Sequence, residues 1–174
     1  MAKKNGLIIC GFPGVGKSSC AGWENCIDLE SSYFSQTVGM VEKSYFSKPM
    51  GMLDWTILYT TMAIKLAEQG YTIFVSTHAQ VIWRLIQLRK KIPVIIFAPC
   101  HSMKEKWTER LEKRYAKTND PKDLRALKFA QNSWDTAMAD IENCGLPVVR
   151  PSTMDYDLKD YIHSIRFRYV DKKE

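Results

Sequence analysis

Short apolar runs alternate with longer helical stretches along the chain. The runs cover residues 7–10, 26–29, 71–75, 93–98 and 147–149. Several are apolar without alternation, as expected for strands that are covered on both faces. This order is typical of a βαβ protein with a parallel sheet. We therefore predict a single α/β domain over residues 1–174, because about 150 residues per domain is the usual size.

Polar caps and glycines mark the helices between these runs. Asp54 is expected to cap a helix that reaches Gln69 and stops at Gly70. The period of its apolar residues predicts a buried stripe. The stripe would consist of Trp55, Leu58, Tyr59, Met62 and Leu66.

Further helices are predicted in the second half of the chain. One helix is expected over about residues 80–90, with ends that the sequence does not mark clearly. A second helix is expected to begin at a Ser102–Glu105 capping box and to run to about residue 117. Asp120 and Pro121 begin a helix that is expected to continue to about residue 143. A last helix follows Asp155 and covers about residues 156–166.

Composition agrees with an ordinary globular protein. The apolar fraction is 45% and the charged fraction 25%, which excludes a disordered or low-complexity chain. No apolar run is long enough to span a membrane, and the short run at residues 7–10 is not a signal-peptide core, so we expect a cytoplasmic protein without a membrane partner. Five scattered cysteines without a C-x-x-C pair indicate reduced thiols rather than zinc.

The net charge is +6, with a pI near 9.0. An excess of this size suits an anionic partner such as a nucleotide, although it also fits a merely soluble basic surface. No basic stripe with interleaved aromatics stands out along the chain, and its nearest equivalent, the Arg-Phe-Arg-Tyr tail at residues 166–169 with Lys172 and Lys173, is better explained as a helix end with a solvated tail. We expect no stable nucleic-acid partner, and either a monomer or a homodimer.

One motif carries specific chemistry. Residues 11–18, Gly-Phe-Pro-Gly-Val-Gly-Lys-Ser, fit the phosphate-binding pattern G-x-x-x-x-G-K-[ST], and they follow a predicted strand directly. The glycines let the backbone N–H groups point at phosphate oxygens, Lys17 reaches the β- and γ-phosphates, and Ser18 ligates Mg²⁺. A short helix from Lys17 to about Trp23 would direct its N-terminus at the same anion. The ATP-binding residues would be Gly11, Pro13, Gly14, Val15, Gly16, Lys17, Ser18 and Ser19.

Two acids follow the second predicted strand. Asp28 and Glu30 are two residues apart, so on a strand they point to the same side. In an open parallel sheet, ligands bind at the carboxyl ends of the strands. One carboxylate is a candidate for the Mg²⁺ shell and the other for orienting or deprotonating an acceptor. Alternatively, one of them simply caps the next helix.

A second basic cluster lies in the charged stretch of residues 107–128. Arg110 and Arg114 are four residues apart and share a helix face. A lid carrying arginines excludes water and neutralises the charge that develops during phosphoryl transfer. The alternative is a solvated helix face with Glu109 and Glu112 as ion-pair partners.

At this point the sequence resembles the small phage and prophage nucleoside monophosphate kinase-like proteins, within the adenylate kinase-like P-loop kinases. The resemblance rests on residues 11–18, Ile-Asp-Leu-Glu-Ser-Ser at 27–32, Phe-Val-Ser-Thr-His at 74–78 and the stretch 103–114. It implies a five-stranded parallel sheet in the order 2-3-1-4-5, with a short helical lid at about residues 102–128. It also implies phosphoryl transfer from ATP, with Mg²⁺, to a nucleoside monophosphate, and an origin in a phage.

The resemblance also implies site residues. Lys17, Asp28, Arg110 and Arg114 would be catalytic, and Ser18 and Asp28 would hold the metal. Residues 31–55 would form a flap over the acceptor, with its aromatic residues free to stack on a base. Lys43 and Lys48 are candidates for contacting the acceptor phosphate. The acceptor-binding residues would include Glu30, Ser31, Ser32, Phe34, Trp55, His78 and Arg84.

The sequence departs from the family pattern at the third strand. Many adenylate kinase-like enzymes carry a metal-proximal Asp there, but residues 75–78 read Val-Ser-Thr-His. Asp28 or a water would take that role. His78 and Arg84 are candidates for an acceptor phosphate, while a purely structural role at the strand end is an equal alternative for His78.

Three functions stay open on the sequence alone. The first is a (deoxy)nucleoside monophosphate kinase, which explains both the phosphate-binding motif and the second arginine set. The second is a P-loop kinase acting on a hydroxyl group of a nucleoside, a polynucleotide end or a modified DNA base. Such an acceptor needs a general base, whereas a phosphate is already an anion. The third is a non-enzymatic, nucleotide-gated module that binds nucleic acid.

Overall fold

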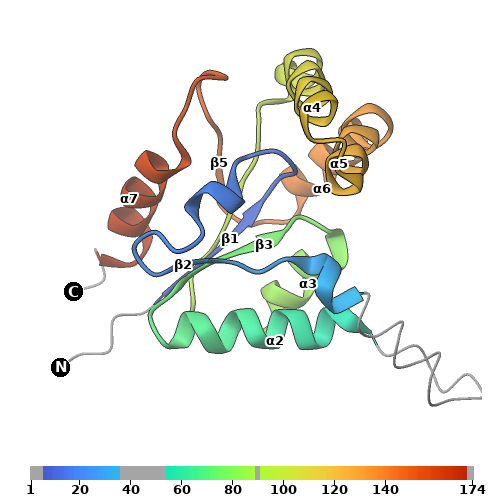
Figure 1. Cartoon of the computed structure of the whole chain (residues 1–174). Coiled ribbons are helices and arrows are strands. Elements are labelled where there is room, and N and C mark those ends of the chain that lie inside the picture. The colour runs from blue at the N-terminus through green and yellow to red at the C-terminus, as the bar shows by residue number, and fades with distance from the viewer. Residues whose placement is uncertain (1–5, 36–53, 89–90, 172–174) are drawn as a thin grey trace, which may run out of the picture.

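The structure is a computed structural model that describes residues 6–35, 54–88 and 91–171. Five parallel strands form one sheet in the order β2-β3-β1-β4-β5, which confirms the expected topology (Figure 1). β1 and β4 are fully buried and β3 is buried up to Ser76, as their mainly apolar sequences predict. The strands are β1 (Leu7–Gly11), β2 (Cys26–Asp28), β3 (Thr72–Ser76), β4 (Val94–Phe97) and β5 (Val148–Val149).

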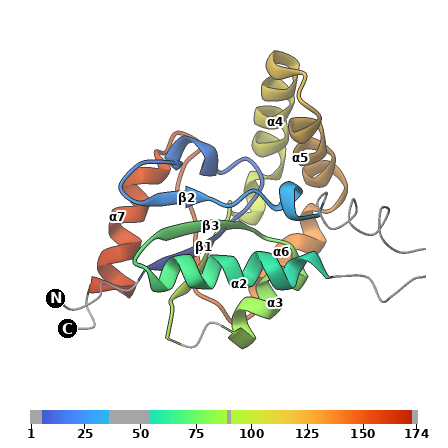
Figure 2. The ribbon, with the colours of Figure 1, turned by 60° about the horizontal axis from the view of Figure 1, so that its bottom comes forward.

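Helices cover both faces of this sheet. α2 and α3 lie against one face, and α7 lies on the other, beside the turn η1 (Figure 1). α4 and α5 form an antiparallel hairpin that projects from the body of the domain (Figure 2). The elements are η1 (Lys17–Cys20), α2 (Trp55–Glu68), α3 (Ala79–Leu88), η2 (His101–Met103), α4 (Lys104–Thr118), α5 (Pro121–Asn132), α6 (Trp134–Asn143) and α7 (Leu158–Tyr169).

The beginning of α2 was predicted correctly, but its buried face was not. The Asp54 side chain accepts a hydrogen bond from the backbone N–H of Thr56, 3.0 Å away, as a helix cap does. Leu58 and Met62, placed in the predicted stripe, are 54% and 40% exposed. Small residues let the helix lie close to the sheet, and the buried face consists of Thr56, Tyr59, Thr60, Ala63 and Ala67.

The helix after the phosphate-binding motif is shorter than expected. The chain makes only a 3₁₀ turn, η1, in place of a helix to Trp23. Gly22, Glu24 and Asn25 all have positive φ, and the N–H of Gly22 bonds to the carbonyl oxygen of Cys26. This tight reversal ends the turn and leads directly into β2.

The helices of the predicted lid, α4 and α5, also begin and end differently from the prediction. The Ser102–Glu105 capping box is wrong, because Ser102 lies inside η2 and α4 begins after Met103 without a side-chain cap. Asp120 does cap α5, but the predicted long helix is broken at Ser133. The break turns α6 towards the sheet, where it buries Trp134 and Met138.

The last helix begins later than predicted. Asp157, rather than Asp155, caps α7 by accepting from the N–H of Lys159. Tyr156 stays outside the helix because its side chain is engaged elsewhere: the hydroxyl donates to the carbonyl oxygen of Val15 across 3.0 Å. The α3 prediction is close to the observed bounds, and residues 89–90 lie outside the described part.

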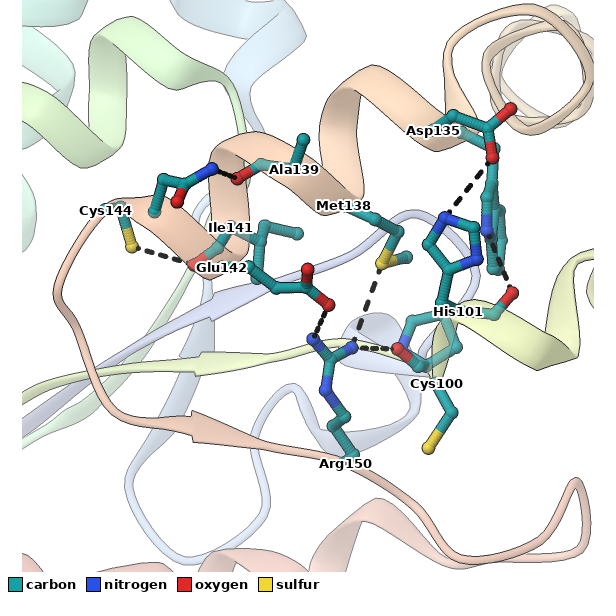
Figure 3. Close-up of polar contacts among 12 residues, drawn as sticks. Cys100, His101, Asp135, Met138, Ala139, Ile141, Glu142, Cys144 and Arg150 are labelled. Carbon is teal, nitrogen blue, oxygen red and sulfur yellow. Dashed lines mark hydrogen bonds and ion pairs between the residues drawn. The ribbon is translucent and has the colours of Figure 1, made fainter.

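Arg150 ties β5 to the neighbouring elements (Figure 3). Its guanidinium donates to the carbonyl oxygen of Pro99 after β4 and to the carboxylate of Glu142 on α6, and it contacts the sulfur of Met138. A charged group with several acceptors is stable when half-buried. This link joins the end of β5 to α6 and to the segment that follows β4.

Candidate active site

A cavity of about 470 Å³ lies at the carboxyl ends of β1, β2 and β3. This is where an open parallel sheet binds its ligands. The phosphate-binding loop forms one side, and the lid helix α5 forms another. Between them stand the residues that follow β2 and β3, including Asp28, Glu30, Ser31, Ser32, Ser76 and His78.

The phosphate-binding loop has the backbone shape that its glycines predict. Gly14 and Gly16 have φ values of +85° and +96°, which residues with a Cβ rarely adopt. Gly14 also leaves no space for a larger residue, because a Cβ there would lie 2.9 Å from Leu111 of α4. Pro13, Gly14, Gly16, Lys17 and Ser18 all line the cavity.

Lys17 crosses the mouth of this loop. Its ammonium donates to the carbonyl oxygen of Gly11, 2.8 Å away. A Cβ at Gly11 would lie 2.7 Å from the Lys17 side chain, so glycine is needed there for the lysine to pass. Burial lowers the pKa of Lys17, and the nearby charges of Asp28 and Glu30 counteract that shift. The lysine thus lies near two carboxylates whose charges favour its protonated form.

Asp28 lies at the end of β2 with an unusual environment. Its Oδ1 atom is buried and has no hydrogen-bond partner among the described residues. Burial raises the pKa of this carboxyl, and the charge of Lys17 opposes the rise. An oxygen of this kind is suited to a hard cation or to a proton. Ser18 lines the same cavity, so the two predicted metal ligands are together.

Glu30 is engaged with the lid. Its carboxylate accepts from the ammonium of Lys122 on α5, 92 residues away in sequence. Burial acts to raise the pKa of Glu30, but the hydrogen bond and charge of Lys122 outweigh it and lower the pKa. The predicted acid therefore links the end of β2 to the lid hairpin.

The lid presents three cations to the cavity. Arg114 pairs with Asp123 across 2.8 Å, and Asp123 is almost fully buried and also accepts from the Thr118 hydroxyl. Lys122 is paired with Glu30. Arg125 has no ion-pair partner within residues 6–35, 54–88 and 91–171. It is therefore the cation of the lid that is available to an anionic ligand.

Aromatic rings and hydroxyls form the rest of the wall. Trp55, Tyr59 and Phe129 line the cavity together with Ser31, Ser32 and Ser35. The Tyr59 hydroxyl donates to the carbonyl oxygen of Leu29 and accepts from the N–H of Ser76, so it connects the ends of β2 and β3.

His78 belongs to the same wall. Its Nδ1 lies 2.8 Å from the Ser76 hydroxyl, and its ring meets the Trp55 ring edge-on. Burial and the charge of Lys17 lower the pKa of His78. The imidazole is therefore neutral at pH 7.

The structure does not bring every predicted residue to the cavity. Arg110 does not line the cavity, and its guanidinium lies 5.4 Å and 5.6 Å from the ring centroids of Trp107 and Tyr156. Arg84 pairs with Asp54 instead of lining the cavity. Phe34 packs edge-on against Tyr59.

Other predicted residues support the loop or fall outside the description. Gly11 and Val15 are buried, and the Ser19 hydroxyl bonds to the carbonyl oxygen of Gly16. Residues 36–53 of the predicted flap, including Lys43 and Lys48, lie outside the described residues.

Sequence reasoning missed the contribution of α5. Lys122, Arg125, Ala126 and Phe129 all line the cavity. Arg125, Ala126 and Phe129 follow Lys122 by three, four and seven residues, so the four lie on one helix face. This spacing can be recognised in the sequence. No cavity-lining role was predicted for the individual residues of this helix, which was expected to continue to about residue 143.

The comparisons with known proteins agree with the fold. Along 94% of this chain and 95% of the other, the structure superposes on the Deinococcus radiodurans tunicamycin resistance protein, with a TM-score of 0.56 and 15% sequence identity. The chain therefore has a P-loop kinase-like fold. No protein-family model matches the sequence, and no curated protein does.

Two further searches of the described residues bear on partners. None of their helices is long and apolar enough to cross a membrane. They also contain no group of three or more His, Cys, Asp or Glu side chains placed to hold a metal.

Proposed function

We propose that the protein transfers the γ-phosphoryl group of ATP to a (deoxy)nucleoside monophosphate, giving ADP and the diphosphate. One observation carries this proposal: the phosphate-binding loop with Lys17 and the cations Lys122 and Arg125 of the lid face the same cavity. Two anionic substrates then meet between two basic walls. Phosphoryl transfer depends mainly on such positioning and charge neutralisation.

The donor phosphates belong in the glycine loop. The N–H groups of Gly14, Gly16 and Lys17 would hold them, together with the Lys17 ammonium. Mg²⁺ would be held by Ser18 and, directly or through water, by Asp28. The buried, unpartnered Oδ1 of Asp28 supports this assignment, because it is a free oxygen ligand beside Lys17. When bound, the metal neutralises charge on the phosphates.

The acceptor belongs between β2, α2 and α5. Arg125 would bind its phosphate, and the rings of Trp55 and Phe129 offer faces for its base. The hydroxyls of Ser31, Ser32 and Ser35 are available to its sugar or base. Glu30 would hold Lys122 near the same phosphate.

Arg114 would act on the group in transfer. Asp123 and Thr118 fix its guanidinium at the edge of the cavity, so the arginine needs little reorganisation when charge develops. Arg110 would not act there, because the structure places it against Trp107 and Tyr156. We thus reassign Arg110 from the catalytic set to the support of the loop.

One observation favours a second candidate, a kinase acting on a hydroxyl acceptor. Burial raises the pKa of Asp28 and makes its carboxylate a stronger base, as a hydroxyl nucleophile requires. The similar structure is named for tunicamycin resistance. Tunicamycin therefore belongs among the acceptors to be tested, beside nucleosides and DNA ends.

An acceptor panel tests the proposal. The protein is incubated with ATP and Mg²⁺ and, separately, with each common NMP and dNMP, nucleosides, DNA with 5′-hydroxyl ends, and tunicamycin, while ADP is measured. ADP formation that depends on one or a few monophosphates supports the proposal and identifies the base. ADP formed only with a hydroxyl acceptor supports the second candidate. ATP binding without ADP from any acceptor contradicts both and favours a non-enzymatic module.

The Asp28→Asn variant separates the two roles of Asp28. Loss of a metal ligand raises the Mg²⁺ concentration needed for half-maximal rate. Loss of a general base removes the acidic limb of the pH–rate profile and leaves the Mg²⁺ dependence unchanged. The phosphate-acceptor mechanism predicts the first result.

A further inference from the structure

The outward carbonyl groups of the phosphate-binding loop are held by side chains from distant elements. The indole N–H of Trp107, on α4, donates to the carbonyl oxygen of Pro13 across 2.9 Å. The hydroxyl of Tyr156, before α7, donates to the carbonyl oxygen of Val15 across 3.0 Å. These donors lie 94 and 141 residues from their acceptors.

Each of these bonds fixes the direction of an N–H group. In a planar trans peptide, the C=O and N–H bonds point in opposite directions. When the Pro13 carbonyl is held on the outer side, the N–H of Gly14 points inward. In the same way, the bond to Val15 directs the N–H of Gly16 inward. Gly14 and Gly16 both line the cavity, so these are N–H groups that face the donor phosphates.

Both held peptides precede a glycine of positive φ. Gly14 and Gly16 have φ values of +85° and +96°. Glycine allows rotation of the preceding peptide at little steric cost. The glycines that allow this loop shape therefore also allow its N–H groups to rotate away from the cavity, unless a contact from outside the loop holds them.

The two donors form one rigid unit. Trp107 is fully buried, its ring packs edge-on against Phe12, and it lies nearly parallel to the Tyr156 ring at a centroid distance of 6.4 Å. The guanidinium of Arg110 contacts both rings. Burial raises the pKa of Tyr156 to about 12, so its hydroxyl keeps the proton that it donates.

We propose that Trp107 and Tyr156 are positioning residues for the donor triphosphate: they hold the Pro13–Gly14 and Val15–Gly16 peptides so that both N–H groups face the phosphates. This rests on the proposed function only in assigning the loop to a nucleotide. The ligand class is a polyphosphate chain, with or without a base. The helix α4 then has a second role, because Trp107 in its first turn shapes the donor site.

Two single-group deletions test the inference. Trp107→Phe removes the indole N–H and keeps an aromatic ring, and Tyr156→Phe removes only the hydroxyl. Trp134→Phe and Tyr161→Phe are matched controls: the Trp134 indole N–H bonds to the carbonyl oxygen of His101 and the Tyr161 hydroxyl accepts from the N–H of Ser152. Neither control group contacts the loop backbone. Calorimetric titration with ATP and with inorganic tripolyphosphate gives both affinities, and urea unfolding monitors stability.

We expect each test variant to bind ATP and tripolyphosphate about three- to tenfold more weakly, which is the effect of one hydrogen bond. The controls should stay within about twofold of the wild type. Equal affinity for tripolyphosphate in wild type and both test variants would overturn the inference. So would the same loss in the controls, because that indicates general destabilisation. If Trp107→Phe does not fold, Tyr156→Phe decides the question.

The test also separates this inference from the proposed function. Wild-type protein that binds neither ATP nor tripolyphosphate contradicts both. Wild-type protein that binds ATP but transfers no phosphoryl group contradicts the proposed function, and the variants still decide the role of Trp107 and Tyr156. A variant that loses ATP affinity but keeps tripolyphosphate affinity contradicts the inference, because its side chain then acts on the base.

Discussion

The ammonium of Lys17 donates a hydrogen bond to the carbonyl oxygen of Gly11 across 2.8 Å. The lysine thus spans its own loop, and it stands near the carboxylates of Asp28 and Glu30. A bound triphosphate would replace these partners with charged oxygens. With a triphosphate bound, the lysine would contact the ligand rather than the core, so its loss should affect function before stability.

Replacing Lys17 with alanine should abolish turnover and leave the fold intact. The ammonium stabilises charge on the transferring group, and removal of one such contact costs about 10³-fold in rate. The measurement is ADP formation with the best acceptor, together with urea unfolding. Lys65→Ala, on the exposed face of α2, is the control and should keep the wild-type rate. Near-normal turnover in Lys17→Ala would refute the site assignment.

Gly11→Ala should weaken ATP binding about tenfold or more. The new Cβ would lie 2.7 Å from the Lys17 side chain and 3.1 Å from Val15, so the lysine must leave its path. Overpacking also lowers the free energy of unfolding by about 1–3 kcal/mol. Titration calorimetry measures the first effect and urea unfolding the second. Wild-type ATP affinity in this variant would show that the path of the lysine does not matter.

Asp28→Asn should stabilise the ligand-free protein while it impairs catalysis. Burial raises the pKa of Asp28, so at neutral pH the folded chain holds a desolvated carboxylate that the unfolded chain does not. The free energy of unfolding should rise by about 1 kcal/mol in the variant.

The gain in Asp28→Asn should depend on pH in a defined direction. It is present above the raised pKa of Asp28 and disappears as the pH falls below the ordinary aspartate pKa of 3.8, where the carboxyl is protonated in both states. Urea unfolding between pH 4 and pH 8 measures this difference. A variant that is less stable than wild type at pH 7 would contradict the assigned environment.

Arg125→Ala should raise the KM for the acceptor about tenfold or more and leave ATP affinity unchanged. Within the described residues this guanidinium has no ion-pair partner, so it is available to the acceptor phosphate. Initial rates at varied acceptor concentration measure the effect. Arg168→Ala, an exposed arginine on α7, is the matched control. An unchanged acceptor KM in Arg125→Ala would show that other cations bind the acceptor phosphate.

Apolar runs and helix caps predicted the parts of the fold that depend on residues close together in the chain. The apolar runs located all five strands within a residue or two, and Asp54 and Asp120 cap their helices as their positions indicate. The order of the strands came from the resemblance to P-loop kinases. The Ser102 cap failed because η2 places that residue inside a turn. The indole N–H of Trp134, from 33 residues further along the chain, donates to the carbonyl oxygen of His101 in that turn.

In the candidate site, too, the features set by neighbouring residues could be predicted and those set by distant residues could not. The glycine loop is a contiguous motif, so its shape could be predicted. The position of Arg110 could not, because Tyr156 comes from 46 residues further along the chain and its ring lies beside the guanidinium. The bonds from Trp107 and Tyr156 to the loop are equally non-local, and no pattern in residues 11–18 indicates them.

Transfer of a labelled γ-phosphoryl group tests the central claim most directly. The protein is incubated with γ-³²P-ATP, Mg²⁺ and each nucleoside monophosphate, and the products are separated by thin-layer chromatography. The proposed function predicts label in the nucleoside diphosphate of at least one acceptor, and none with Lys17→Ala. Label found only in inorganic phosphate, or only in a product of a hydroxyl acceptor, would contradict it.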